Sequence, residues 1–226
     1  MSTMADSTSA GGPAAASGIG STGDCGPAAV PAGTIVTVLS QADGQPVAAT
    51  VQTWSAGDEG LVISARLTVG AAAVARLADQ RVWVSLTHDA PGFTVFGGIA
   101  HAAGDDSLDV TGVAPLVREA RRTAPRAAAT TRVMVTTPSL RTHDLRAVDL
   151  GRGGVRVSLQ EPAELTAGER VTVEVHLEDG ATVLAGGQVA RVDEAAGQAV
   201  VRFDELANGE GSRLDRFALL RLTAPR

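Results

Sequence analysis

Short runs that alternate apolar and polar residues appear along the chain from residue 33 onward. The first series is rich in Val, Ile and Thr, which favour strands, and Gly, Pro and Asp residues separate its members. The expected strands are 34–40, 47–54, 60–67, 81–87, 93–101 and 106–112. Residues 70–79 form either a short helix or another connection. Six strands at this spacing predict a small antiparallel β-barrel.

A second series of strands begins after residues 113–126, where two prolines and four arginines break the pattern and mark a linker between domains. The expected strands are 131–137, 142–150, 154–159, 169–177, 181–192 and 197–205, with a tight turn at Glu178-Asp179-Gly180. Ser212 and Asp215 then have the spacing of a capping box, and apolar residues recur after them at helical spacing. This pattern predicts a closing helix.

The predicted fold class is therefore all-β, with two small antiparallel β-barrels, a C-terminal helix that closes the second barrel, and a disordered N-terminal tail. The tail, 1–32, has almost no large apolar residues and cannot bury enough surface to offset its ordering entropy. The barrel domains are expected at 33–117 and 118–226. Since neither a secretory signal nor a run of about 18 apolar residues is found, we expect a cytoplasmic protein without membrane insertion.

The distribution of charge points to one region of the second domain. The chain carries a net charge of −6, and all 19 basic residues are Arg. Between residues 118 and 156, nine Arg and three acidic residues give +6, whereas the ten Arg and 22 acidic residues elsewhere give −12. A local positive field in a negative molecule favours a small anion over nucleic acid, which the remainder would repel. The stacking aromatics of single-strand binders are also missing here, because Trp54 and Trp83 lie in the first domain.

Two motifs in this region resemble those of PilZ domains. The sequence "RRTAPR" at 121–126 is similar to the doubled RxxxR loop of the family, and "DLGRGG" at 149–154 is similar to its Asp/Asn-x-Ser-x-x-Gly motif at Asp149, Gly151 and Gly154. The order of the motifs, strands and closing helix also resembles the family. The β-domain before the loop resembles the amino-terminal barrel of flagellar-brake PilZ proteins, so the resemblance covers 33–226.

The resemblance implies a receptor for cyclic di-GMP that needs no metal or cofactor and is not an enzyme. Arginine forks would engage guanine N7 and O6, stack on the bases or bind phosphate, and Asp149 would accept N–H bonds from a guanine edge. The implied ligand-binding residues are Arg121, Arg122, Arg126, Asp149, Gly151, Gly153 and Gly154, with Arg118 and Arg152 as additional candidates. The implied output is a changed arrangement of the barrels, read by flagellar motor or exopolysaccharide-synthesis proteins.

One position departs from the family pattern, and several alternatives stay open. Gly151 stands where the family usually has Ser. Because Gly151 has no hydroxyl to bond the ligand, the free energy of binding should be weaker by about 0.5–1.5 kcal/mol. A Ser at this position should tighten binding if the turn tolerates a side chain. For the first motif, the alternative is that the Arg-rich loop is only a solvated linker. For the second motif, it is a strand turn with a glycine bulge. For the whole protein, it is a protein–protein adaptor whose nucleotide site has decayed. His88, His101, His143 and His176 have no metal-ligand spacing, so no metal site is expected.

Overall fold

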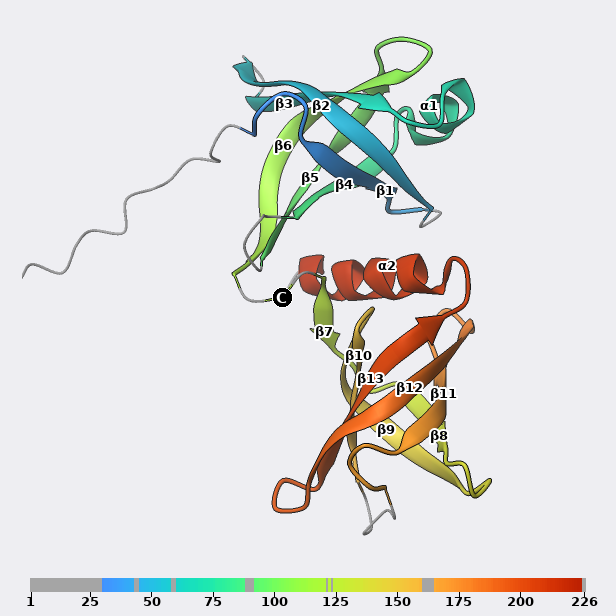
Figure 1. Ribbon diagram of the computed structural model, residues 1–226. Helices are drawn as coiled ribbons and strands as arrows, with labels where there is room; N and C mark the ends of the chain where they lie inside the picture. The colour runs from blue at the N-terminus through green and yellow to red at the C-terminus, as the bar shows by residue number, and fades with distance from the viewer. Residues whose placement is uncertain are drawn as a thin grey trace, which may run out of the picture.

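The computed structural model describes residues 30–42, 45–57, 60–87, 92–120, 122, 124–159 and 165–224. The first domain is a closed antiparallel barrel of six strands in the order β1-β2-β3-β6-β5-β4 (Figure 1). Its elements are β1 (Ile35–Ser40), β2 (Pro46–Gly57), β3 (Gly60–Leu67), α1 (Ala71–Leu77), β4 (Arg81–Thr87), β5 (Phe93–Ala102) and β6 (Ser107–Glu119). The barrel prediction is confirmed, and residues 71–77 adopt the helical alternative.

The second domain is also a closed barrel, formed by the ring β8-β11-β12-β13-β10-β9. Its elements are β7 (Arg126–Ala128), β8 (Arg132–Thr136), β9 (Thr142–Gly151), β10 (Gly154–Ser158), β11 (Arg170–His176), β12 (Thr182–Asp193), β13 (Gln198–Leu206) and α2 (Glu210–Thr223). The short strand β7 precedes β8 along the same edge of β9. The predicted all-β class and the closing helix are confirmed.

Alternating burial along the strands builds a separate core inside each barrel. In β11, Val171, Val173 and Val175 point inward, while Thr172 and Glu174 between them point outward. Most core side chains are Val, Leu or Ala, as the low aromatic content of 3% requires. The expected tail lies outside the described residues up to residue 29. Within its last part, Val30 is only 7% exposed and packs on the first core.

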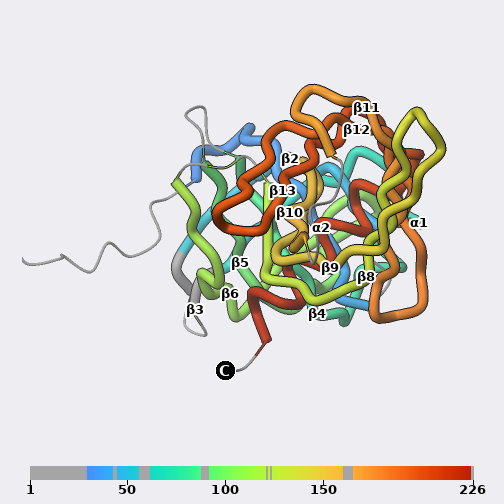
Figure 2. Tube along the Cα trace, turned by 90° about the horizontal axis from the view of Figure 1, so that it is seen from below, coloured from blue at the N-terminus to red at the C-terminus, as the bar shows by residue number. Residues whose placement is uncertain are grey.

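Helix α2 lies between the two barrels (Figure 1) and contributes side chains to both. Leu214 is fully buried in the core of the second barrel. On another side of the helix, Leu219 joins a buried cluster of the first barrel, formed by Leu39, Trp83, Phe93 and Val95. Figure 2, viewed along the stack, shows the two barrels superimposed in projection. Neither described helix is long and apolar enough to cross a lipid bilayer.

A polar contact supports the same interface. The Arg216 guanidinium donates to the backbone carbonyl oxygens of Gln41 at 3.0 and 3.2 Å and of Ala42 at 3.1 Å. Because both acceptors belong to the turn after β1, α2 is joined to the first barrel by hydrogen bonds as well as by apolar packing.

Two sequence predictions were wrong at element boundaries. Residues 113–119 continue β6 instead of forming a linker. Pro115 pairs with Phe96 of β5 at a register shift, and it lies beyond Val113, the last residue of β6 that pairs with β3. A missing N–H costs little at such an edge. Helix α2 begins at Glu210 after Gly209, whose φ of +87° suits glycine, and no side chain caps it. The expected capping box at Ser212 therefore lies inside the helix.

Candidate functional site

Strand β9 brings the two predicted motifs together on the outer surface of the second barrel. On one side of β9, Arg126 of β7 pairs with Gly151. On the other side, β10 places Arg156 opposite Asp149 and Gly154 opposite Gly151. Because side chains alternate across a strand, these positions share the outer face while the residues between them fill the core. Two arginines from different strands thus flank one aspartate.

The Asp149 carboxylate lies between two guanidinium groups and is only 13% exposed. Arg126 Nε lies 3.1 Å from Asp149 Oδ1, and Arg156 Nη2 lies 2.5 Å from Asp149 Oδ2. Among the described residues no well-aligned hydrogen-bond donor meets Asp149 Oδ1, although this atom is buried. This oxygen therefore keeps acceptor capacity, and a ligand can reach it only after a neighbouring group moves.

Positive charge is concentrated around this aspartate. Burial lowers the pKa of Arg126, the charges of Arg122 and Arg156 lower it further, and Asp149 opposes them. Arginine stays protonated at neutral pH despite such a shift, so the guanidinium groups repel one another. The Arg122 side chain is half-exposed, and its Nη1 lies 3.8 Å from Glu119 Oε2. The cluster is therefore suited to attract an anion that relieves this repulsion.

The glycines of the second motif meet the backbone in different ways. A Cβ on Gly151 would lie 2.4 Å from the carbonyl oxygen of Pro125, so the arginine loop packs directly on this residue. Gly154 has a φ of +147°, and a Cβ there would lie 2.3 Å from the Val201 carbonyl oxygen. A Cβ on Gly153 would meet open space. Of these two glycines, only Gly154 has a positive φ.

The Gly151→Ser variant should therefore be less stable than the wild type by about 1–3 kcal/mol, because its Cβ displaces the loop at Pro125. The turn does not tolerate a side chain in this arrangement, and tighter ligand binding is expected only if the loop moves away. Urea denaturation measures the loss, with Gly153→Ser as the matched control because its position is open. Equal stabilities of the two variants would contradict the close packing of the loop.

The turn between β9 and β10 also contacts α2. Arg152 Nη1 lies 3.6 Å from Asp215 Oδ2. The Arg152 side chain lies so close to the helix that a Cβ on Gly211 would come within 2.9 Å of its Nε atom. Burial raises the pKa of Asp215 to about 6, and the charge of Arg152 opposes this shift. The second motif is thus linked to the helix that joins the barrels.

The remaining predicted residues lie elsewhere. Arg121 lies outside the described residues. Arg118 is exposed on β6, opposite Thr94, and so belongs to a strand of the first barrel rather than to the loop. Sequence reasoning missed Arg156, although strand alternation places it on the face of Gly154 two residues earlier. It also missed the ion pair of Asp215 with Arg152, because it assigned Asp215 to a helix cap.

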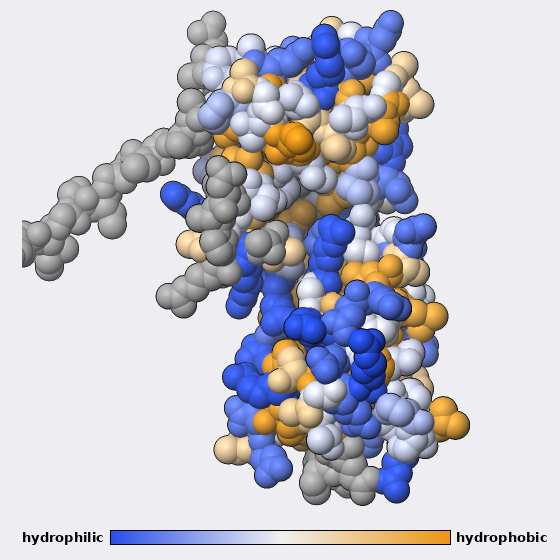
Figure 3. Space-filling view, viewed as in Figure 1, coloured by the Kyte–Doolittle hydropathy of each residue, from blue (hydrophilic) through white to orange (hydrophobic). Residues whose placement is uncertain are grey.

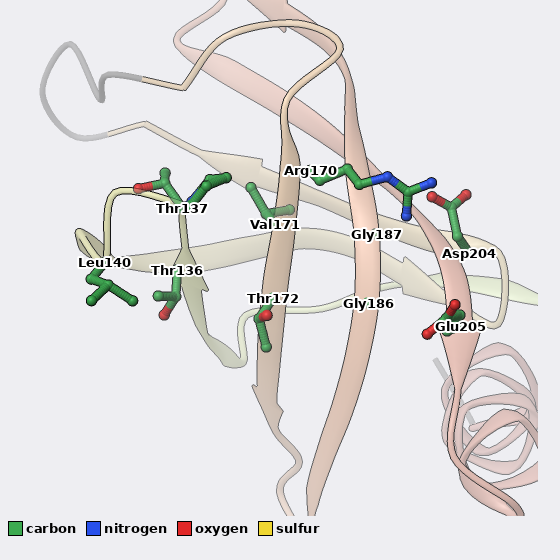
Figure 4. Close-up of a pocket in the computed structure, with 11 residues that line it drawn as sticks. Thr136, Thr137, Leu140, Arg170, Val171, Thr172, Gly186, Gly187, Asp204 and Glu205 are labelled. Carbon is green, nitrogen blue, oxygen red and sulfur yellow. The ribbon is translucent and has the colours of Figure 1, made fainter.

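Two hollows on the described surface lie away from this cluster. One of about 370 Å³ covers the outer faces of β8, β11, β12 and β13, with Arg170, Asp204 and Glu205 at its edge (Figure 4). It presents two carboxylates beside one guanidinium, so it suits an anion less well than the cluster around Asp149. Figure 3 shows hydrophilic side chains over much of the face beside β7 and α2. Arg126, Asp149 and Arg156 line neither of the two hollows.

Comparison with known proteins finds a family match for the second domain. Residues 120–220 match the family model of the PilZ domain. No curated protein sequence matches the chain. The Bacillus subtilis inhibitor of motility (MotI/DgrA) is 15% identical, with 85% of this chain and 97% of that chain covered and a TM-score of 0.41. Escherichia coli YcgR, solved in complex with c-di-GMP, is 14% identical over 83% of each chain, with a TM-score of 0.38.

Proposed function

Since residues 120–220 of the chain are a PilZ domain, we propose that the protein is a receptor for cyclic di-GMP and that the cluster around Asp149 is its binding site. The observation that carries this proposal is the placement of the Asp149 carboxylate between Arg126 and Arg156. The two strands that flank β9 supply these cations, and Arg122 adds a third charge from the loop. Cyclic di-GMP offers two phosphates to the cations and guanine N–H groups to the carboxylate.

Binding requires an exchange of partners at Asp149. In this structure, Arg126 lies beside the buried oxygen Oδ1 of Asp149. A phosphate group attracts Arg126 away from the carboxylate, and the exposed oxygen then accepts N–H bonds from the Watson–Crick edge of guanine. Because the ion pair between Arg126 and Asp149 must break, its free energy weakens ligand binding. The same pair keeps both polar groups paired when no ligand is bound.

The ligand signal would pass through the arrangement of the barrels. The arginine loop directly connects β6 of the first barrel with β7 of the second, between Glu119 and Arg126. A loop that closes over a ligand therefore pulls on both domains. The ligand acts only through its unequal affinity for the two arrangements. In this proposal the protein is a cytoplasmic effector, not an enzyme, and it regulates motility or exopolysaccharide output through contacts with those machines.

Calorimetric titration of the full chain with cyclic di-GMP tests the proposal. Arg122→Ala and Asp149→Ala should each weaken binding by about tenfold or more, because each removes a charge-assisted contact. Arg156→Ala should have a similar effect, because it removes the second cation that holds Asp149. The matched control is Arg170→Ala, which removes an exposed arginine at the separate hollow and should leave the affinity unchanged. Unchanged affinity in all three site variants would refute the assignment.

A second candidate function is a protein–protein adaptor without nucleotide binding. Two observations favour it, since Asp149 already has arginine partners within the protein and the loop at Pro125 fills the space beside Gly151. If the wild-type chain gives no heat with cyclic di-GMP at tens of micromolar, the adaptor is the better explanation. Saturable binding that the three site variants weaken favours the receptor.

A further inference from the structure

Arg152 belongs to the second motif, and its side chain also contacts helix α2. It lies in the middle of the second motif, between Gly151 and Gly153, and its side chain is 60% exposed. It also forms an ion pair with Asp215, which is 22% exposed on α2. Among the described residues, no hydrogen-bond donor meets Asp215 Oδ1, which is buried. Asp215 thus has one charged partner, and that partner belongs to the second motif.

We propose that Arg152 is shared between Asp215 and the bound dianion, so that ligand binding withdraws the guanidinium from Asp215 and this carboxylate becomes more protonated, with the proton taken from solvent. The inference rests on the proposed function, because it requires an anionic ligand at the cluster around Asp149. It gives Asp215 the role of a positioning residue, which holds Arg152 at the helix when the site is empty.

The surroundings of Asp215 leave Arg152 as the cation that matters. On α2 itself, Arg213 lies 3.9 Å from Glu210, and Arg216 donates to Gln41 and Ala42 of the first barrel. Besides β1, β4 and β5 around Leu219, the strands β7, β9 and β6 pack against α2. Their charged groups at this end of the barrel are Arg126 and Asp149, which pair with each other, and Arg118 and Glu119. Arg152 is the charged group that opposes the raised pKa of Asp215.

Loss of this partner changes the protonation of the carboxylate. A buried carboxylate without a cation prefers the neutral form, because its charge is poorly solvated. The pKa of Asp215 already stands at about 6 with Arg152 beside it. If Arg152 moves from Asp215 to the ligand, the pKa of Asp215 rises further. A buffer molecule then gives up a proton, which forms an O–H bond on the Asp215 carboxylate. The phosphodiesters of the ligand stay ionised throughout, so the net reaction is binding of one ligand and part of one proton.

The test is calorimetric titration of the full chain with cyclic di-GMP near pH 6.5, in two buffers of different ionisation enthalpy. A rise of about one unit in the pKa of Asp215 predicts uptake of about half a proton per ligand, and affinity that tightens about fivefold between pH 8 and pH 6. Asp215→Asn should bind the ligand without proton uptake and without this pH dependence. Arg152→Ala should bind more weakly and also without uptake, because no guanidinium can be withdrawn.

Each outcome bears on a separate claim. The matched control Asp204→Asn changes an acidic residue outside the site and should keep the wild-type proton uptake. Binding by the wild type without proton uptake, or uptake that persists in Asp215→Asn, overturns the inference and leaves the receptor function intact. The absence of any binding by the wild type in either buffer overturns the proposed function itself. Circular dichroism of each variant checks that it is folded.

Discussion

Replacing Leu219 with alanine should lower the free energy of unfolding by about 2–4 kcal/mol and loosen the contact between the barrels. Leu219 is only 2% exposed and is the helix residue in the apolar cluster with Leu39, Trp83, Phe93 and Val95. Truncation leaves a cavity at this interface, whereas alanine keeps the helix itself favourable. The hydrogen bonds of Arg216 alone should not keep the barrels in one arrangement.

Calorimetry and small-angle X-ray scattering measure the two consequences. Leu219→Ala should separate the thermal unfolding of the barrels into two transitions and broaden the distribution of distances in solution. The matched control is Leu214→Ala, the same change on the same helix, at a side chain that is fully buried in the second barrel. It should cost about 2–5 kcal/mol, mainly in the second barrel, and leave the interface in place. Equal scattering and equal cooperativity of the two variants would contradict the role of Leu219.

Alternation of apolar and polar residues predicted most of the strands closely, because turn residues mark their ends. The expected strands 60–67 and 81–87 coincide with β3 and β4. The extension of β6 to Glu119 could not be predicted, since Pro115 normally interrupts a strand and only the pairing partners show that it lies at an edge. The three-residue strand β7 is too short for a periodic pattern to indicate it.

Residues of the candidate site could be predicted from the sequence where a motif contains them, and not where only the fold brings them together. Asp149 and Arg126 belong to motifs, and the register of β7 and β9 brings them together. Arg156 follows the second motif, so no spacing rule includes it. Asp215 has the spacing of a capping residue, but the helix begins earlier, and the buried position of its carboxylate depends on how α2 packs on the barrel.

Replacing Asp215 with asparagine should raise the free energy of unfolding by up to about 3 kcal/mol near neutral pH. The leucine variants should lower this free energy instead. Burial raises the pKa of Asp215 from 3.8 to about 6 in the folded protein. Each pKa unit corresponds to about 1.4 kcal/mol, so ionised Asp215 destabilises the folded state by this difference. Asparagine keeps the shape of the side chain and removes the buried charge.

The pH dependence distinguishes this cause from a general improvement in packing. Because the folded state binds the Asp215 proton more tightly than the unfolded state, the protonated carboxyl contributes stability that is fully present below about pH 4. This contribution is lost as the pH rises through the pKa of about 6 in the folded protein. The wild type and Asp215→Asn should therefore be about equally stable at low pH, and their free energies of unfolding should diverge between about pH 4 and pH 6.

Urea denaturation at a series of pH values measures this divergence, and Asp144 supplies a control of opposite sign. Hydrogen bonds from Arg132 hold the pKa of Asp144 below its ordinary value, so its ionised form stabilises the folded state and this contribution is lost as the pH falls. Asp144→Asn should be less stable than the wild type at neutral pH. A constant difference between Asp215→Asn and the wild type at every pH would show that the buried charge is not the cause. Divergence in the expected window would mean that the chain carries a destabilising carboxylate beside the second motif, as the proposed proton linkage requires.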